Sequence, residues 1–224
     1  MTRIIFVTGT DTGVGKTIFA ASLVWYLRSK GTEALGLKPF CSGTRDDVKL
    51  LQEVQPGKLS DDEVNPFYFP EAVAPLVSER KHRRNVMLGD AVRRIRAVER
   101  KCDLLVIEGS GGLLVPLGEG FTVADLVKAL RCELIIVARN RLGTINHSLL
   151  TVAAAKKLRP RSIKVVLMDG DRDESTGTNC DILRELLAPI AIVEYPFLGQ
   201  TAAKPGLFQR RKRILEKVLA RVLE

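Results

Sequence analysis

The sequence predicts an α/β fold in which a doubly wound, mostly parallel sheet carries helices on both faces. Short apolar runs alternate with stretches of helical period along the whole chain, as in sheets built from strand–helix–strand units. A glycine-rich turn joins the first apolar run to the first helical stretch, and 224 residues are enough to cover such a sheet on both faces. We find no internal repeat and no linker, so residues 1–224 are expected to form one domain.

The composition excludes disordered and membrane-spanning proteins. Hydrophobic residues make up 46% of the chain, and no apolar run is long enough to span a membrane. Much of the net charge of +9 lies in residues 80–101 and 210–221, which have the pattern of helices with a solvated basic face. Aromatic residues are not interleaved with these basic residues, so we expect no nucleic-acid partner and no membrane partner. The four cysteines lack metal-ligand spacing, and an enzyme of the kind indicated below implies a reducing cytoplasm.

The first predicted strand, residues 4–7, leads into the sequence GTDTGVGKT at residues 9–17, and a helical pattern follows it. A glycine-rich turn between a strand and a helix is the context of a phosphate-binding loop, because its backbone N–H groups and the helix start attract anions. The usual pattern has its first glycine at residue 10, so this loop contains one extra residue. The residues expected to bind a nucleotide here are Thr12, Gly13, Val14, Gly15, Lys16, Thr17 and Ile18.

The second predicted strand is residues 33–37, and Pro39 ends it because proline lacks the N–H that a ladder needs. Residues 40–43 are then predicted to form a loop at the carboxyl end of a strand, where open α/β sheets bind ligands. A short helix starts over residues 45–51, and an aromatic segment between two prolines, residues 65–70, is expected to be extended.

After a helix over residues 86–101, the run 102–108 is predicted to be a buried strand that ends in Glu108. An acid at such a strand end has the form of a Walker B element, which places a carboxylate where Mg²⁺ needs one. Residues 109–112 are predicted to be a second backbone-rich turn at the same edge of the sheet.

The remaining chain continues the alternation. Further helices are predicted over residues 122–130, 142–158, 178–187 and 207–223, and further strands over residues 133–138, 162–168 and 190–195. The strand at 133–138 is apolar nearly throughout, as in a parallel sheet that is covered on both faces.

Seven stretches of the chain together resemble the dethiobiotin synthetase family, whose enzymes act in the biotin pathway. They are GTDTGVGKT at 9–17, KPFCSG at 38–43, NPFYF at 65–69, EGSGG at 108–112, VPL at 115–117, LGTINH at 142–147 and YPFL at 195–198. The loop of this family also carries the extra residue. The stretches occur in the family's order and cover most of the chain, so the set is specific although the loop alone is not.

The resemblance implies a ligase with the P-loop NTPase fold, which acts on 7,8-diaminononanoate, CO₂ or bicarbonate, and a nucleoside triphosphate. An amine becomes a carbamate, the carbamate attacks the γ-phosphorus, and the second amine closes a cyclic urea. The resemblance implies that Lys16 and Lys38 are the catalytic cations. It also implies that Thr17, Asp47 and Glu108 ligate Mg²⁺.

The remaining site residues also follow from the resemblance. The nucleotide would further contact Asp47, Glu108, Gly109, Ser110, Gly111, Asp169, Gly170, Pro196, Phe197 and Leu198. Ser42 would hold the carbamate. A homodimer is implied, because the substrate carboxylate binds the second subunit through the backbone N–H groups of the helix start formed by Gly143, Thr144, Ile145 and Asn146. His147 is expected to be structural.

Two positions depart from the family. Asp169 stands where an asparagine would read adenine, and an ionised aspartate can only accept hydrogen bonds. We therefore expect ATP to be used and GTP or CTP to be able to replace it. A tyrosine that some members place near the substrate carboxylate falls around Asn179 in this chain.

Two other functions compete with this interpretation. A cobyrinate-type amidotransferase shares the modified loop but needs a glutaminase domain, for which 224 residues leave no room. A membrane-cycling partition ATPase would use the closing helix as an anchor, through the apolar stripe Ile214, Leu215, Val218, Leu219 and Val222. Such ATPases carry a second lysine early in the loop, whereas residues 9–15 contain none. We expect the stripe to pack on the sheet.

Overall fold

The centre of the computed structural model is a six-stranded parallel sheet with the strand order β10-β9-β8-β1-β5-β2. The structure describes residues 2–171, 173–199 and 206–224. The strands are β1 (Arg3–Gly9), β2 (Ala34–Leu37), β5 (Leu104–Gly112), β8 (Glu133–Arg139), β9 (Ile163–Met168) and β10 (Ala191–Tyr195). The predicted α/β fold with a parallel sheet is therefore confirmed.

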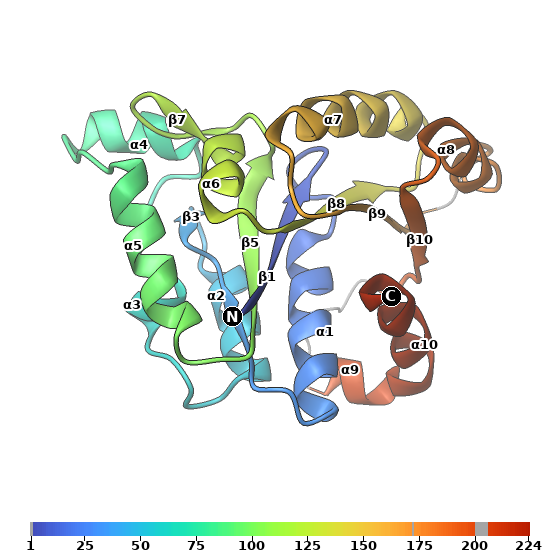
Figure 1. Cartoon of the computed structure of the whole chain (residues 1–224), viewed down its shortest axis with the longest axis horizontal. Helices are drawn as coiled ribbons and strands as arrows, with labels where there is room; N and C mark the ends of the chain where they lie inside the picture. Colours follow the sequence, from blue (N-terminus) through green and yellow to red (C-terminus); the bar gives the residue numbers. More distant parts are fainter. Residues whose placement is uncertain (1, 172, 200–205) are drawn as a thin grey trace.

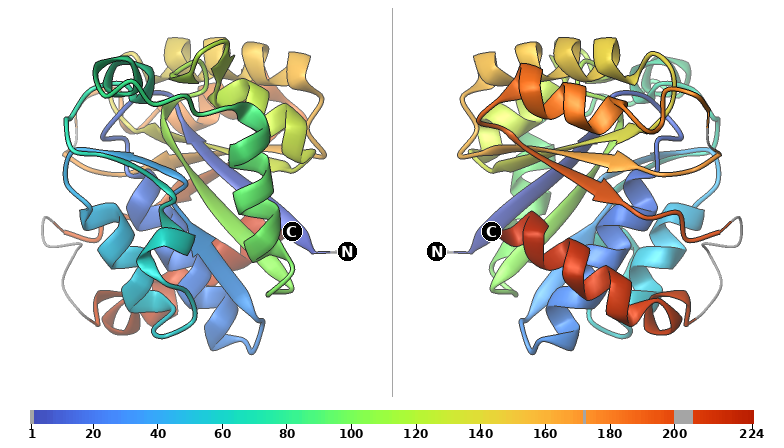
Figure 2. Two further views of the ribbon diagram at one scale, coloured as in Figure 1. Left: turned by 90° about the vertical axis from the view of Figure 1, so that its left-hand side faces the viewer. Right: turned by 90° about the vertical axis from the view of Figure 1, so that its right-hand side faces the viewer.

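Helices cover both faces of this sheet (Figures 1 and 2). Helix α1 (Lys16–Ser29) lies on one face together with α2 (Asp46–Val54) and α10 (Lys212–Leu223), while α5 (Leu88–Glu99), α6 (Val123–Leu130) and α7 (Thr144–Leu158) lie on the other. Helix α8 (Asn179–Leu187) packs beside α7 and β10. Strand β1 is followed by a crossover toward one edge of the sheet and β5 by a crossover toward the other. This change of direction opens a crevice at the carboxyl ends of the strands.

Two small sheets and three short helices complete the structure. They are β3 (Phe40–Ser42) with β4 (Phe67–Phe69), β6 (Pro116–Gly118) with β7 (Phe121–Thr122), and the helices α3 (Asp61–Val64), α4 (Pro75–Lys81) and α9 (Leu207–Arg210). Helix α4 contacts β3, β4 and β6. These elements lie at the carboxyl end of the main sheet or beside it, and several of them line the candidate site.

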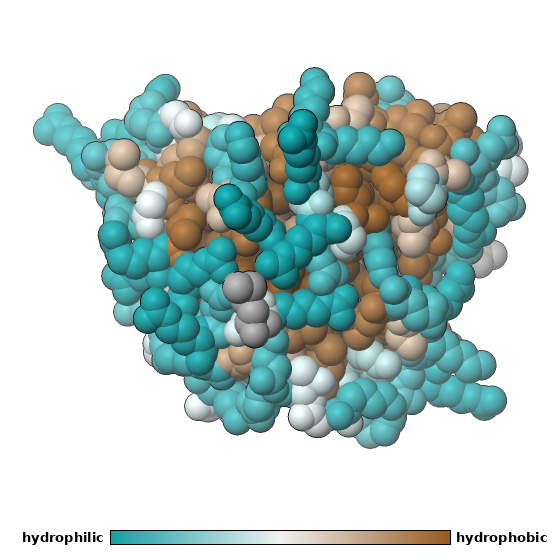
Figure 3. All heavy atoms as spheres, in the orientation of Figure 1, coloured by the Kyte–Doolittle hydropathy of each residue, from teal (hydrophilic) through white to brown (hydrophobic). Residues whose placement is uncertain are grey.

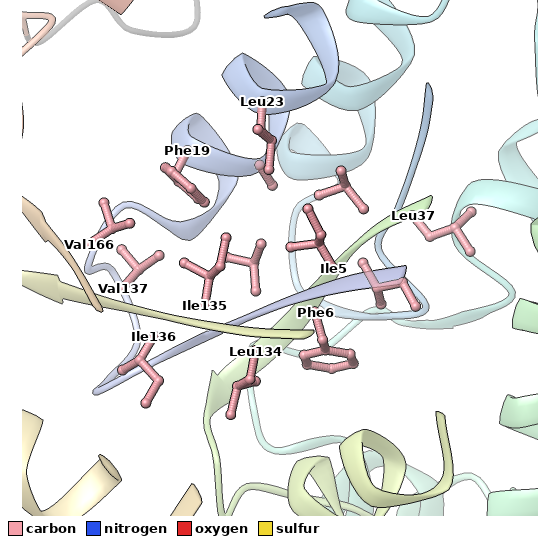
Figure 4. Close-up of a cluster of buried hydrophobic side chains, with 14 of the residues drawn as sticks. Ile5, Phe6, Phe19, Leu23, Leu37, Leu134, Ile135, Ile136, Val137 and Val166 are labelled. Atoms are coloured by element: carbon pink, nitrogen blue, oxygen red, sulfur yellow. The ribbon is translucent and has the colours of Figure 1, made fainter. Parts of the chain in front are cut away.

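The core is formed by apolar side chains that alternate across the strands. Figure 4 shows Ile5 and Ile135 on the side of the sheet that faces Phe19 of α1, while Phe6 and Leu134 lie on the opposite side. All five side chains are buried. Successive strand residues point to opposite faces, so a sheet that is covered on both faces requires nearly continuous apolar strands. The apolar runs that predicted these strands therefore have a direct cause in the packing.

Three predictions about local structure were wrong. Residues 40–43, predicted to be a loop, contain β3, because Phe40–Ser42 pairs with the distant β4 and the Phe40 ring stacks on Phe67 at 4.7 Å. Residues 109–112, predicted to be a turn, continue strand β5, whose register with β1 shifts between Val7 and Gly9. The closing helix is interrupted at Arg211, which lets Phe208 pack against Trp25 of α1.

Most of the apolar stripe of the closing helix faces inward, and Ile214, which is 46% exposed, is the exception. Leu215, Leu219 and Val222 are buried, and α10 contacts both α1 and β10. This packing confirms the expectation that the stripe belongs to the core of the domain. Among the helices that the structure describes, none is long and apolar enough to cross a lipid bilayer.

The edge strand β2 is capped by a side chain in place of a neighbouring strand. The Gln55 side chain is fully buried, accepts from the backbone N–H of Gly36 at 2.7 Å and donates to the Gly36 carbonyl at 2.9 Å. These are the two hydrogen bonds that another strand would have made. Gly36 is also crowded, because a Cβ there would lie 2.9 Å from Leu51.

We therefore expect Gln55→Leu to destabilise the protein. Two buried backbone groups would lose their partners, at a total cost of about 2–4 kcal/mol in the free energy of unfolding. Urea denaturation would measure this cost. Gln52→Leu is the matched control, because Gln52 bonds to the backbone of Leu59 and to Asp61 near the surface and should cost less than about 1 kcal/mol. Equal losses in the two variants would contradict the capping role.

Candidate functional site

The phosphate-binding loop predicted from the sequence lies between β1 and α1. Gly13 and Gly15 adopt left-handed backbone conformations, with φ of 72° and 101°, which glycine reaches without strain. A Cβ at Gly9 would lie only 2.7 Å from the Asp11 carbonyl oxygen, so the loop with its extra residue turns back tightly on its own start. The Lys16 ammonium donates to that same Asp11 carbonyl at 2.9 Å.

The three predicted metal ligands come together around the Lys38 ammonium. Its Nζ lies 2.6 Å from Oε1 of Glu108 and 2.8 Å from Oδ2 of Asp47. The Thr17 hydroxyl donates to Glu108 Oε1 at 2.8 Å. Lys38 and Glu108 are 5% and 1% exposed. Elements that are far apart in the sequence therefore bring two carboxylates, one hydroxyl and one ammonium to a single point.

Burial and charge act against each other in this cluster. Burial raises the pKa of the Glu108 carboxyl, and the Lys38 ammonium opposes that rise. Burial alone would lower the pKa of Lys38, but the carboxylates of Glu108 and Asp47 outweigh it and hold that pKa above its ordinary value. Burial together with the nearby Lys38 ammonium lowers the pKa of Lys16 to about 8. Lys38 is therefore charged at neutral pH and balances one of the two negative charges, that of the buried Glu108 or of the half-exposed Asp47.

The chemistry of this cluster fits Mg²⁺. Oε2 of Glu108 is buried and has no hydrogen-bond partner among the described residues. Two carboxylates and a hydroxyl are hard oxygen ligands, and Mg²⁺ is usually held by one or two carboxylates with phosphate and water completing the shell. The described residues contain no group of three or more His, Cys, Asp or Glu side chains that could hold a metal ion alone. The donor set therefore suits a metal that arrives with a nucleotide.

One cavity joins the Lys38 cluster to the predicted carbamate site. It has a volume of about 350 Å³ and is lined by Thr12, Lys38, Cys41, Ser42, Asp47, Ala72, Val73, Ala74, Pro75, Ser110, Gly111 and Val115. The Ser42 hydroxyl is buried and makes no hydrogen bond to any residue that the structure describes, so it is free to bind a ligand in the cavity. The Ser110 hydroxyl donates to the Phe40 carbonyl at 2.6 Å, and this hydrogen bond fixes the position of one wall of the cavity. Burial raises the pKa of the Cys41 thiol to about 11, so this cysteine is a poor nucleophile.

A second cavity, of about 190 Å³, brings together the other residues predicted to bind a nucleotide. It is lined by Gly13, Val14, Gly15, Ile18, Arg139, Met168, Asp169, Gly170, Tyr195, Pro196, Phe197, Leu198 and Gly199. Arg139 and Met168 were not predicted from the sequence to line this cavity. Both end strands of the main sheet, so their positions at carboxyl ends were a signal that could have found them. The Met168 side chain also closes against the loop, 2.9 Å from the position of a Cβ at Gly15.

The start of helix α7 is separate from these two cavities. Gly143 precedes the helix with φ of 91°, and the Thr144 hydroxyl is buried without a partner in the described chain. Thr144 lines a small hollow beside the phosphate loop, and His147 lines the same hollow. A further cavity of about 430 Å³ lies between the loop, residues 112–116 and the α7 surface at Leu150, Thr151 and Ala154.

The chain matches the family model described as an AAA domain over residues 3–203. Similar curated proteins include the ATP-dependent dethiobiotin synthetase BioD of Bacillus licheniformis, 42% identical over 72% of this chain and 71% of that protein. The enzyme of the same name from Bacillus subtilis strain 168 is 34% identical over 89% of this chain and 87% of its own length.

Solved structures with the same fold include two proteins with low sequence identity to this chain. A ParA family ATPase from Chlorobium tepidum TLS is 14% identical, with a TM-score of 0.62 over 97% of this chain and 96% of its own. The septum site-determining protein MinD complexed with Mg-ADP, from Pyrococcus horikoshii OT3, is 16% identical, with a TM-score of 0.62 over 98% of this chain and 93% of its own. At these identities the likeness shows the fold alone.

We expect that removing the Lys38 charge alone destabilises the protein more than removing the charges of Lys38 and Glu108 together. Lys38→Met removes the cation and leaves the buried Glu108 carboxylate unpaired, which should lower the free energy of unfolding by about 3–5 kcal/mol. The double variant Lys38→Met/Glu108→Gln removes both charges and should recover most of that loss. Urea denaturation of the two variants and the natural protein measures the difference. A double variant as unstable as Lys38→Met would show that the ion pair does not govern stability here.

Proposed function

The chain belongs to the ATP-dependent dethiobiotin synthetase family, and from this premise we propose the roles that its own residues take in the reaction. The reaction closes a cyclic urea on 7,8-diaminononanoate with CO₂ and ATP to give dethiobiotin, ADP and phosphate. One observation carries the assignment of roles. The phosphate-binding loop, Lys38 and the unpartnered Ser42 hydroxyl open onto a single cavity, where a carbamate oxygen could meet a γ-phosphate.

The chemistry needs positioning and charge more than covalent catalysis. One substrate amine attacks CO₂ and loses a proton to form the carbamate, which Ser42 holds by a hydrogen bond. The carbamate oxygen attacks the γ-phosphorus and ADP leaves. The second amine then attacks the carbamate carbon, and phosphate leaves as the ring closes. Lys16 and Lys38 neutralise the charge that spreads over the phosphoryl oxygens.

In this proposal the Lys38 ammonium first pairs with the two carboxylates and later binds the carbamate and the γ-phosphate. In the structure its ammonium is engaged by Asp47 and Glu108. Together with Thr17, these two carboxylates would hold Mg²⁺, which when bound supplies positive charge beside the phosphates. Lys38 would then be released toward the carbamate and the γ-phosphate, since the carboxylates no longer need its charge.

The nucleotide is proposed to run from the loop into the 190 Å³ cavity, where its base lies near Asp169 and the segment Pro196–Leu198. A carboxylate accepts hydrogen bonds from base amino groups but donates none. Adenine, guanine and cytosine each carry an amino group. We therefore propose that ATP is used and that GTP or CTP can replace it.

The substrate tail is proposed to reach a second copy of the chain. Leu142 and Leu150, at the start and middle of the α7 region, are 81% and 63% exposed, and Leu150 borders the 430 Å³ cavity beside the loop. Figure 3 shows apolar surface over α7 at the upper edge of the molecule. Exposed leucines at the mouth of a cavity are typical of an interface. A homodimer through α7 would place the helix start of residues 143–146 at the partner's site. The N–H of Thr144 donates to the Arg141 carbonyl at 3.1 Å, so the N–H groups of Gly143, Ile145 and Asn146 would be the ones to bind a carboxylate there.

The cytoplasm is the proposed location of the enzyme. All four cysteines are free thiols in the structure, which reducing compartments preserve.

The direct test incubates the protein with 7,8-diaminononanoate, bicarbonate, Mg²⁺ and ATP, with detection of dethiobiotin by mass. Lys16→Ala should lose both turnover and nucleotide affinity, because it removes a cation from the loop. Lys38→Met should lose at least 100-fold in turnover while ATP binds nearly as before, since an electrostatic group aimed at the reacting phosphate contributes on this scale. Lys49→Ala, an exposed lysine of α2, is the control and should keep full activity. Product formation by Lys38→Met at the natural rate would remove Lys38 from the mechanism.

The proposed dimer predicts an effect of Leu150→Glu. A charge in the middle of an apolar interface is unpaired and desolvated, so the variant should be monomeric by sedimentation velocity at concentrations where the natural protein is dimeric. Its turnover should fall in parallel, because the substrate tail loses its partner. Leu186→Glu, at an exposed apolar position on α8, is the matched control and should remain dimeric. A natural protein that sediments as a monomer at assay concentration would refute the proposed interface.

A further inference from the structure

Two buried amide groups, linked by a hydrogen bond, hold the side chain of Asp169. These amides have no role in the function proposed above. Asn140, which follows β8, donates from Nδ2 to Oδ1 of Asp169 at 3.0 Å. Oδ1 of Asn140 accepts in turn from Nδ2 of Asn179 at 2.9 Å, at the start of α8. Both asparagines are only 2% exposed. Asp169 itself lines the cavity proposed for the base.

Neighbouring groups fix the orientation of both amides in this chain, and with it the direction of the hydrogen bonds from Asn179 to Asp169. Nδ2 of Asn179 also lies 3.3 Å from the Arg141 carbonyl, which can only accept, and 3.1 Å from the Ser175 hydroxyl. Nδ2 of Asn140 also donates to the Thr176 carbonyl at 3.2 Å. Turning either amide over would place an oxygen against a carbonyl oxygen. The donor end of Asn140 is therefore held toward Asp169.

We propose that Asn140 is a positioning residue that sets which bases the enzyme accepts. Its amide occupies Oδ1 of Asp169 and leaves Oδ2 as the atom available to a ligand, and that oxygen can only accept. A base with an amino group at the contacted position donates to it, whereas a base with a carbonyl there places two oxygens against each other. This inference rests on the proposed function, because it requires the base to bind in the cavity beside Asp169.

The pair CTP and UTP tests this contact together with ring N3, which is an acceptor in cytosine and an N–H donor in uracil, whereas the pair ATP and purine riboside triphosphate changes the amino group alone. Cytosine carries an amino group where uracil carries a carbonyl, and the sugar and phosphates are identical. An unmatched polar contact in a buried site should separate their dissociation constants by about 10-fold to 100-fold in favour of CTP. Purine riboside triphosphate, which lacks the amino group of ATP, should likewise bind more weakly than ATP. Inorganic tripolyphosphate probes the phosphate loop without a base.

The experiment measures these dissociation constants by calorimetry for the natural protein and for Asn140→Ala. Without the amide, Asp169 can rotate, so the preference for CTP over UTP should fall to about 3-fold or less while the affinity for tripolyphosphate stays within 2-fold. Asn140→Asp is the second variant, because it keeps the shape of the side chain but removes the donor, and it should give the same loss. Ser175→Ala is the matched control within the same network. It leaves the Asn140–Asp169 bond in place and should keep the full preference.

Two results would overturn the inference, and they differ in what else they overturn. If the natural protein binds CTP and UTP equally and also binds ATP and purine riboside triphosphate equally, the base does not meet Asp169, and the proposed base site fails together with the role of Asn140. The other result is that the natural protein prefers CTP and both Asn140 variants keep that preference, with unchanged affinity for tripolyphosphate. The base site then stands, and the chain of amide groups has only a structural role.

Discussion

The ammonium group of Lys38 lies between two carboxylates, and the candidate site depends on this one contact. Glu108 is almost completely buried, and a carboxylate removed from water needs a cation or a proton. Strand β5 supplies Glu108, the chain after β2 supplies Lys38, and α2 supplies Asp47. Because β2 and β5 are parallel neighbours, their carboxyl ends meet at the same edge of the sheet. The strand order thus determines the charge balance of the site.

In the proposed mechanism, this arrangement gives Lys38 both a structural and a chemical role. Lys38 stabilises acids whose burial is unfavourable, and the same buried, charged group can act on a phosphoryl oxygen where water does not screen it. The two roles use the same property, a positive charge in a site of low dielectric. A variant at this position is therefore best interpreted with stability and turnover measured together.

Features that are local in the sequence, or that repeat along it, could be predicted from the sequence alone. Apolar runs predicted every strand of the main sheet, and the acid at the end of one strand predicted Glu108 as a neighbour of the loop, whereas Lys38 was implied by the resemblance to the family. The short elements β3 and α4 were missed because they form against distant segments, as the stacking of Phe40 on Phe67 shows. The β6–β7 hairpin is local, but its strands of three and two residues are too short to give a period. Asn140 was missed for a different reason. A lone asparagine after a strand has the pattern of an ordinary loop residue, and only the folded chain shows its buried partners.

The side chain of Gln55 has a consequence for how copies of this chain can associate. An edge strand with free backbone groups is a template on which another chain can add a strand, which leads to continuous intermolecular sheets and to aggregation. At β2 the Gln55 amide already occupies both backbone groups of Gly36, and all four residues of the strand are buried. Lateral growth of the sheet is blocked at this edge. An assembly that meets here must therefore use side-chain contacts between helices and loops rather than shared backbone pairing.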